Sequence, residues 1–78
     1  MQIDAGVVRT LLDEIIADDV LARLVDGESF RDQGVDSLDV VTLLLALEER
    51  FELVVPDADV PLCSSVDAIV AYAEGRDS

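Results

Sequence analysis

The stretch GVDSLDVV, residues 34–41, places one serine between two aspartates at the start of an apolar run. The hydroxyl of Ser37 is a strong nucleophile only if a base removes its proton and positive dipoles stabilise the resulting charge. Asp36 and Asp39 are carboxylates, and they oppose that charge. We therefore expect no reaction at Ser37 without help, and two interpretations stay open: the serine caps a helix, or it is a handle that another enzyme modifies.

The rest of the chain offers little chemistry. It has no histidine and one cysteine, Cys63, which cannot form an internal disulfide. Cys63 lies among apolar positions and is interpreted as a small core residue with a protonated thiol. Asp57 and Asp59 are spaced as D-x-D but lack the rest of a calcium loop, so we expect a solvated acidic rim there. We predict no metal site and no metal-based or redox function.

Length and charge limit the possible partners. The chain has 78 residues, of which 51% are hydrophobic, and this predicts one compact domain over residues 1–78. The net charge is -13, from 18 acidic and 5 basic residues. Such a surface repels nucleic acid and anionic lipid and attracts basic protein patches. We expect a monomer that binds no nucleic acid.

The hydropathy of the chain indicates where in the cell the protein is located. No apolar run approaches the roughly 20 residues that span a bilayer, so we expect no membrane insertion. The first residues, MQIDAGVV, lack the basic region that opens a secretory signal. Together these observations predict a cytoplasmic protein.

The first half of the chain has helical periodicity and then a loop. Apolar residues recur at helical spacing over residues 7–16, with Asp4 as a possible N-cap. A second apolar set over residues 20–25 is rotated away from the first, which predicts a break near Asp18 and Asp19. Residues 26–36 have the composition of an ordered loop, which we expect Phe30 to anchor to the core.

The second half predicts two more long helices. One begins at Asp36 or Ser37 and continues to about Phe51, and the ELVV stretch that follows is interpreted as a connection. Pro56 and Pro61 bracket a segment with room for about one helical turn. A capping box over residues 64–67 opens the last helix, and Gly75 is expected to stop it. The predicted fold is all-α, a small four-helix bundle with three principal helices and a short one.

The helix over residues 37–51 has two apolar faces at 100° per residue. The face expected to point inward holds Val40, Leu43, Leu44, Leu47 and Phe51. The opposite face, beside Ser37, holds Leu38, Val41 and Leu45, together with Thr42, Glu48 and Glu49. An exposed apolar strip rimmed by acids is typical of a docking surface for a partner protein. The alternative is a helix buried on all sides. So small a bundle has little other protein with which to cover both faces of the helix.

These residues carry a resemblance. The run FRDQGVDSLDVVTLLLALEERFELVVPD resembles acyl carrier proteins, which share D-S-L at the head of a helix, a following A-L-E-E-x-F and a proline-acid step into a short helix. The similarity extends from Phe30 to Gly75 and covers most of the chain. It implies an acyl-carrier bundle and identifies Ser37 as the handle: the attachment site of phosphopantetheine, transferred from coenzyme A by a phosphopantetheinyl transferase.

The resemblance also assigns neighbours and partners. It implies that Asp36 positions or recruits the basic transferase and that Leu38 packs against it, while Asp36 also serves as N-cap. The thiol of the arm carries acyl groups as thioesters to acyl-loading and acyl-processing enzymes with basic docking patches. Ile69 and Tyr72 either line the cleft for a short acyl chain or are ordinary core residues.

Two departures indicate a specialised role. Thr42 and Arg50 stand where primary fatty-acid carriers usually have glutamates, and Pro61 interrupts the short segment. Fewer acids on the docking face change partner choice. We therefore expect a stand-alone carrier in polyketide, lipid or other specialised biosynthesis rather than in primary fatty acid synthesis. Two alternatives stay open: an aminoacyl or peptidyl carrier that uses the same serine, although GVDSL departs from the G-G-x-S-L of that class, and an unmodified helical interaction protein.

Overall fold

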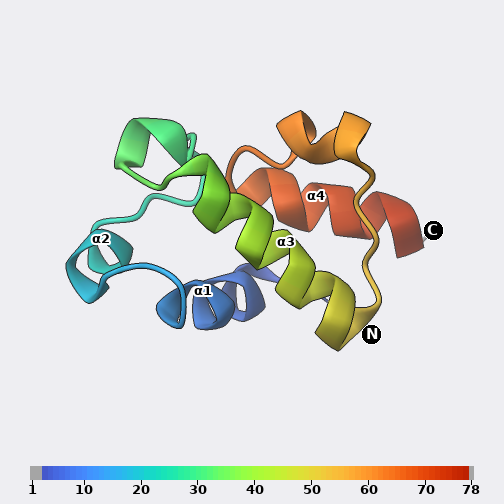
Figure 1. The fold of residues 1–78 in the computed structure, drawn as a ribbon, viewed down its shortest axis with the longest axis horizontal. Coiled ribbons are helices and arrows are strands. Elements are labelled where there is room, and N and C mark those ends of the chain that lie inside the picture. Colours follow the sequence, from blue (N-terminus) through green and yellow to red (C-terminus); the bar gives the residue numbers. More distant parts are fainter. Residues whose placement is uncertain (1–2, 78) are drawn as a thin grey trace.

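The computed structural model describes residues 3–77, and within them the fold is all-α, as predicted, with no strand (Figure 1). The elements in chain order are α1 (Ala5–Asp13), α2 (Asp18–Ala22), η1 (Arg31–Gln33), α3 (Ser37–Phe51), η2 (Asp57–Leu62) and α4 (Val66–Asp77), where η denotes a 3-10 helix. Three of them, α1, α3 and α4, are the principal helices. None of the helices among these residues combines the length and apolar character that crossing a bilayer requires.

The core lies where the principal helices meet. Figure 1 shows α3 crossing in front of α1 and α4, with η2 beside α4 and the loop that contains η1 at the opposite end of the molecule. The largest fully buried side chains come from α1, the loop, α3, α4 and the segment before α4, and they are Val8, Leu12, Phe30, Leu43, Leu47, Cys63, Val66 and Ile69. The predicted anchor, Phe30, is among them.

The first helix begins as predicted and ends earlier than predicted. Asp4 is the N-cap, and its Oδ1 accepts a hydrogen bond of 2.9 Å from the backbone N–H of Val7. The helix ends at Asp13, before Ile15 and Ile16, and the break predicted near Asp18 and Asp19 lies directly before them, since α2 begins at Asp18. Both aspartates belong to the first turn of α2, where the positive end of the helix dipole favours acidic side chains.

The last helix corrects two predictions about its ends. Ser65, not Ser64, supplies the cap: its Oγ accepts a hydrogen bond of 3.0 Å from the N–H of Ala68. The carbonyl of Ser64 instead accepts a bond of 2.8 Å from the N–H of Phe30. Gly75 lies inside α4, which continues to Asp77. A glycine costs only about 1 kcal/mol in a helix interior, so neighbouring residues can carry the helix through it.

The connection from α3 to α4 follows the prediction. The ELVV stretch forms no strand, and Glu52 closes α3 with a left-handed backbone, φ 58°. The short helix predicted between Pro56 and Pro61 is η2, but it continues through Pro61 to Leu62, so Pro61 neither bounds nor interrupts it. Tyr72 on α4 donates a hydrogen bond of 2.7 Å to Oδ2 of Asp59, which ties η2 to α4.

Candidate functional site

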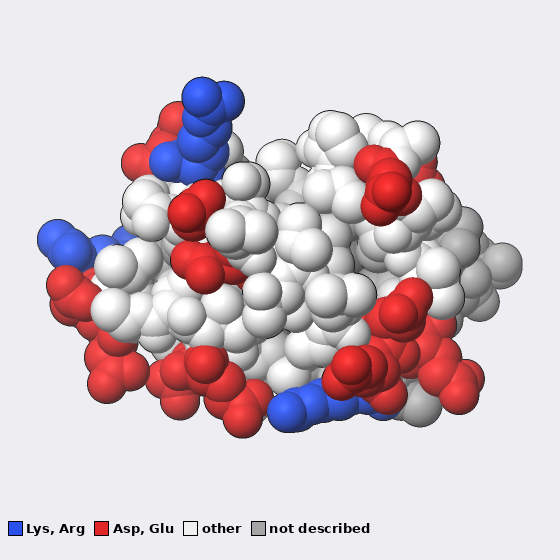
Figure 2. Space-filling model, in the orientation of Figure 1, with Lys and Arg blue, Asp and Glu red and all other residues white. Residues whose placement is uncertain are grey.

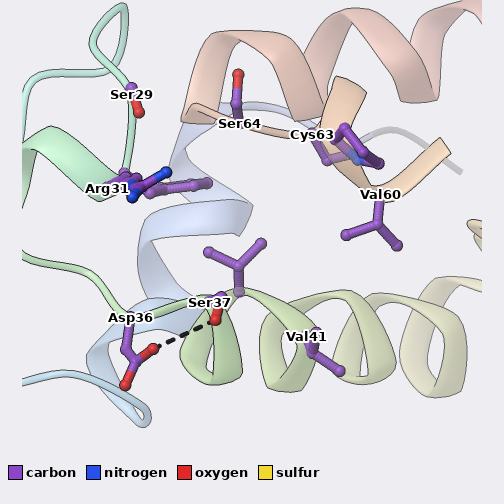
Figure 3. A pocket seen from close by; sticks show the side chains of 11 residues that line it. Ser29, Arg31, Asp36, Ser37, Val41, Val60, Cys63 and Ser64 are labelled. Carbon is purple, nitrogen blue, oxygen red and sulfur yellow. Dashed lines mark hydrogen bonds between the residues drawn. The ribbon is translucent and has the colours of Figure 1, made fainter. Parts of the chain in front are cut away.

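Ser37 is the first residue of α3 and is exposed to solvent. Its Oγ donates a hydrogen bond to Oδ1 of Asp36 over 3.3 Å (Figure 3). The same Oδ1 of Asp36 also accepts a hydrogen bond from the N–H of Leu38 over 3.5 Å. Asp36 is therefore the N-cap, as predicted, although the capping contact is long. A carboxylate is too weak a base to ionise a serine hydroxyl, so this arrangement presents Ser37 without activating it.

Side-chain hydrogen bonds hold the loop before Ser37. The Gln33 Oε1 accepts from the N–H of Val25 over 2.6 Å, and its Nε2 donates to the carbonyls of Val25 and Glu28, each over 3.0 Å. Gly34 has a left-handed backbone, φ 84°, which the missing side chain of glycine permits without strain. These contacts fix the entry of the chain into α3, and no local pattern in the sequence predicts this role of Gln33.

Arg9 joins α1 to the same region. Its guanidinium pairs with Asp26, with 2.7 Å between Nη2 and Oδ1, and its Nη1 donates to the carbonyl of Leu21 over 3.4 Å. Both side chains of the pair are about two-thirds buried, at 34% and 33% exposure. An arginine with several acceptors at once restrains them relative to each other, so α1, α2 and the loop are held as one unit.

A groove with a volume of about 620 Å³ opens beside Ser37. We call it the serine groove, and its lining residues come from the loop, the start of α3, and η2 with the segment after it. Figure 3 shows Ser37, Val41 and Val60 around this space, with Cys63 at its far side. Burial raises the pKa of the Cys63 thiol, and the negative charge of Asp59 adds to the shift, so Cys63 is a neutral part of the wall.

The second predicted feature is the apolar strip on α3. Leu38 is 72% exposed, Val41 42% and Leu45 53%, whereas Leu43, Leu44 and Leu47 point into the core. We call the three exposed residues the outer strip. Thr42, Glu48 and Glu49 are exposed beside it, as predicted. Figure 2 shows uncharged side chains over the middle of this face and acidic side chains around it.

A second, smaller groove of about 100 Å³ runs along the outer strip. It is lined by residues of α3, including Val41, Leu45 and Glu48, and by Val55, Asp57 and Val60 from the connection and η2. Val60, like Val41, therefore lines both grooves. No local sequence pattern predicts this double role, because it depends on how η2 packs against α3.

The remaining predicted residues lie outside the serine groove. Ile69 is fully buried and Tyr72 half-buried, and neither lines the groove. Asp59 is engaged by the Tyr72 hydroxyl. In the part of the chain that the structure describes, no three His, Cys, Asp or Glu side chains gather in a way that could hold a metal ion.

Comparison with known proteins places this geometry in a family. Residues 7–73 match the family model described as phosphopantetheine attachment site. An acyl carrier protein of Campylobacter concisus (strain 13826) is 39% identical over 67 residues, which cover 86% of this chain and 87% of the relative. An acyl carrier protein of Campylobacter lari (strain RM2100 / D67 / ATCC BAA-1060) is 32% identical over 74 residues, 95% of each chain.

The chain therefore belongs to the acyl carrier protein family, which the resemblance in its sequence predicted. Members of this family are carriers rather than catalysts, and their prosthetic group is a covalently attached phosphopantetheine. The structure fits such a group: it offers an exposed serine hydroxyl and, next to it, an open groove with an apolar wall. When bound, the group supplies a thiol that holds an acyl chain as a thioester.

Proposed function

We propose that this protein is a non-catalytic acyl carrier whose phosphopantetheine is attached to Ser37. The observation that carries the proposal is the position of Ser37: exposed at the N-terminus of α3, at the mouth of the serine groove and next to the outer strip. Asp36 orients the hydroxyl through the 3.3 Å hydrogen bond. Because nothing described around Ser37 activates it, the transferase supplies the base and the magnesium.

The modification transfers a phosphopantetheinyl group from coenzyme A to the serine hydroxyl. Oγ of Ser37 forms a bond to the pyrophosphate phosphorus that bears the pantetheine, the bond to the other phosphate breaks, and adenosine bisphosphate leaves. The serine proton passes to the base of the transferase. The chain itself contributes an accessible hydroxyl, a fixed helix start and a docking surface made by Leu38, Val41 and Leu45.

Intact mass spectrometry tests the attachment. We expect incubation with coenzyme A, magnesium and a broad-specificity transferase to add one phosphopantetheine to the native protein. Ser37→Ala abolishes the addition and leaves the helical circular dichroism unchanged. Ser29→Ala and Ser64→Ala are matched controls, because both serines line the same groove, and both variants are modified normally. Addition that persists in Ser37→Ala, or none with several transferases, contradicts the proposal.

We further propose that the load belongs to specialised rather than primary fatty-acid biosynthesis. Two residues of α3 support this. The Thr42 hydroxyl donates to the carbonyl of Leu38 over 2.9 Å, and Arg50 pairs with Glu14 over 3.3 Å, so neither presents a negative charge to a partner. Replacing both by glutamate should raise the rates with fatty-acid enzymes that have basic patches. Rates that stay unchanged in Thr42→Glu/Arg50→Glu count against a charge-based choice of pathway.

The partners follow from the same surface. They are a phosphopantetheinyl transferase and acyl-loading and acyl-processing enzymes whose basic patches meet Glu48 and Glu49. One domain over residues 1–78, a monomeric state and a cytoplasmic location stay predictions from composition and charge. Sedimentation at low and moderate salt measures the oligomeric state.

A further inference from the structure

The serine groove has two chemically different ends. Ser29, Arg31 and Asp36 lie on one side of the view in Figure 3, and Val41, Val60 and Cys63 lie on the other. Ser37 opens between them. The only charged side chains in the lining are those of Arg31 and Asp36. A group attached to Ser37 therefore meets the cation of Arg31 and the carboxylate of Asp36 on one side and an apolar wall on the other.

Arg31 differs from the other arginines whose side chains the structure describes. Arg9 pairs with Asp26, Arg23 with Asp19 over 3.5 Å, and Arg50 with Glu14. Arg31 is exposed and makes no ion pair with any described carboxylate. In a chain with 18 acidic residues, an arginine without a carboxylate partner is available to an anion from outside the fold.

The backbone holds Arg31 in place although its side chain has no ion pair. The adjacent Phe30 is buried, its N–H donates to the carbonyl of Ser64 over 2.8 Å, and its carbonyl accepts from the N–H of Val35 over 3.0 Å. The second bond closes a tight turn that returns the chain to within two residues of Ser37. The guanidinium is thereby carried on a fixed base at the polar end of the groove.

We infer that Arg31 binds an oxyanion carried by the arm on Ser37, namely its phosphodiester; this rests on the proposed function. Attachment bonds Oγ of Ser37 to a phosphorus whose non-bridging oxygens carry a negative charge; Oγ lies 3.3 Å from an oxygen of Asp36, and like charges held so close to each other repel. A guanidinium offsets this repulsion and matches the geometry of phosphate oxygens with two parallel hydrogen bonds. The phosphodiester is preferred to a carboxylate on the load because it is fixed at Ser37, whereas the load lies at the far end of a flexible arm.

Phosphorus NMR of the phosphopantetheinylated protein tests the contact directly. We expect the phosphodiester resonance to move in Arg31→Gln, to move less in Arg31→Lys, and to stay in place in Arg23→Gln, which removes the same charge from an exposed site. In the native protein, salt moves the resonance toward its position in Arg31→Gln, because the screening length falls to about 3 Å at 1 M. We also expect the change in melting temperature caused by phosphopantetheinylation to be a few degrees less favourable to the folded state in Arg31→Gln than in the native protein.

Comparison of unloaded, butyryl-loaded and malonyl-loaded protein separates the two sources of the oxyanion. A difference between native protein and Arg31→Gln that is present without a load, and is unaltered by either load, supports the phosphodiester. A difference seen only with the malonyl load assigns Arg31 to the carboxylate and overturns the inference. Equal resonances in native protein and Arg31→Gln overturn it as well.

Intact mass spectrometry of every sample keeps the two proposals apart. If Ser37 is modified in both proteins and the resonances agree, the inference about Arg31 fails while the attachment site stands. If Ser37 is never modified, the proposed function fails and the inference falls with it. Circular dichroism of Arg31→Gln confirms that the variant folds, as expected for an exposed side chain without an ion pair.

Discussion

Leu45 and Leu47 lie two residues apart on α3, yet Leu45 is 53% exposed and Leu47 is fully buried. The same truncation at both positions therefore separates docking surface from core. Leu47→Ala removes buried methyl groups and leaves a cavity, which costs about 2–5 kcal/mol. A domain of 78 residues has a total stability of roughly 4–12 kcal/mol, so this one change removes a large part of it.

Leu45→Ala has a much smaller effect on stability. Burying a whole leucine side chain contributes about 1.5–3 kcal/mol, and about half of this residue is already in water. Alanine is also the better helix former, by a few tenths of a kcal/mol. We therefore expect a loss of roughly 1 kcal/mol or less.

Urea denaturation measures both losses. With a slope of about 1 kcal/mol per M, suited to so small a protein, the midpoint falls by about 2–5 M for Leu47→Ala and by about 1 M or less for Leu45→Ala. Leu47→Met is the control for the buried site, because it conserves volume and should cost less than about 1.5 kcal/mol.

Partner kinetics should show the reverse order. Leu45→Ala removes apolar contact area made only in the complex, and we expect modification of Ser37 to slow about fivefold or more. Glu48→Lys reverses a charge beside the same strip and slows association with basic partners. Leu47→Met keeps the native rate. If Leu45→Ala unfolds at the same urea concentration as Leu47→Ala, the outer strip is core and the docking surface assigned to α3 is wrong.

Three further predictions concern stability. Sodium chloride should raise the melting temperature, because it screens repulsion among 18 acidic residues while the exposed ion pairs contribute little; a steady fall with salt contradicts this. Ser65→Ala should lower the melting temperature by about 4–8 °C, because it removes the capping hydrogen bond to the N–H of Ala68, and Ser64→Ala should not lower it; equal effects of the two substitutions place the cap elsewhere. Burial, with a smaller effect from Asp59, raises the pKa of the Cys63 thiol above its ordinary value of 9.0. The folded state therefore keeps the thiol proton to a higher pH than the unfolded chain does. The resulting stabilisation is complete below the ordinary pKa and is lost as the pH rises through the raised pKa of the folded state. In urea titrations at alkaline pH, the free energy of unfolding should therefore fall less in Cys63→Ala than in the native protein.

Local patterns predicted much of the fold. The helical spacing of Leu43 and Leu47 identified the buried face of α3, and Asp4 and Asp36 identified the helix starts, because these features depend on neighbours within one or two turns. The cap of α4 was misplaced by one residue, since the carbonyl of Ser64 is used by Phe30, which is distant in sequence.

The site was predictable in part for the same reason. Ser37 and the outer strip lie on one helix, so their order along the chain fixes their relation in space. The serine groove instead joins the loop, α3 and η2, and no local pattern states that Arg31 and Val60 line one space. Gln33 likewise acts through backbone groups of the loop, whose positions only the folded chain defines.

Val60 lines both grooves, and this links the space beside Ser37 to the outer surface of α3. The same side chain lines the serine groove with Ser37 and the smaller groove with Leu45 and Glu48. Any occupant that displaces Val60 from within reshapes the outer surface at the same time. The hydrogen bond from Tyr72 to Asp59 opposes that displacement, because it ties the residue next to Val60 to α4. An occupant of the serine groove that moves Val60 would therefore also change the surface that a partner enzyme meets beside Leu45 and Glu48.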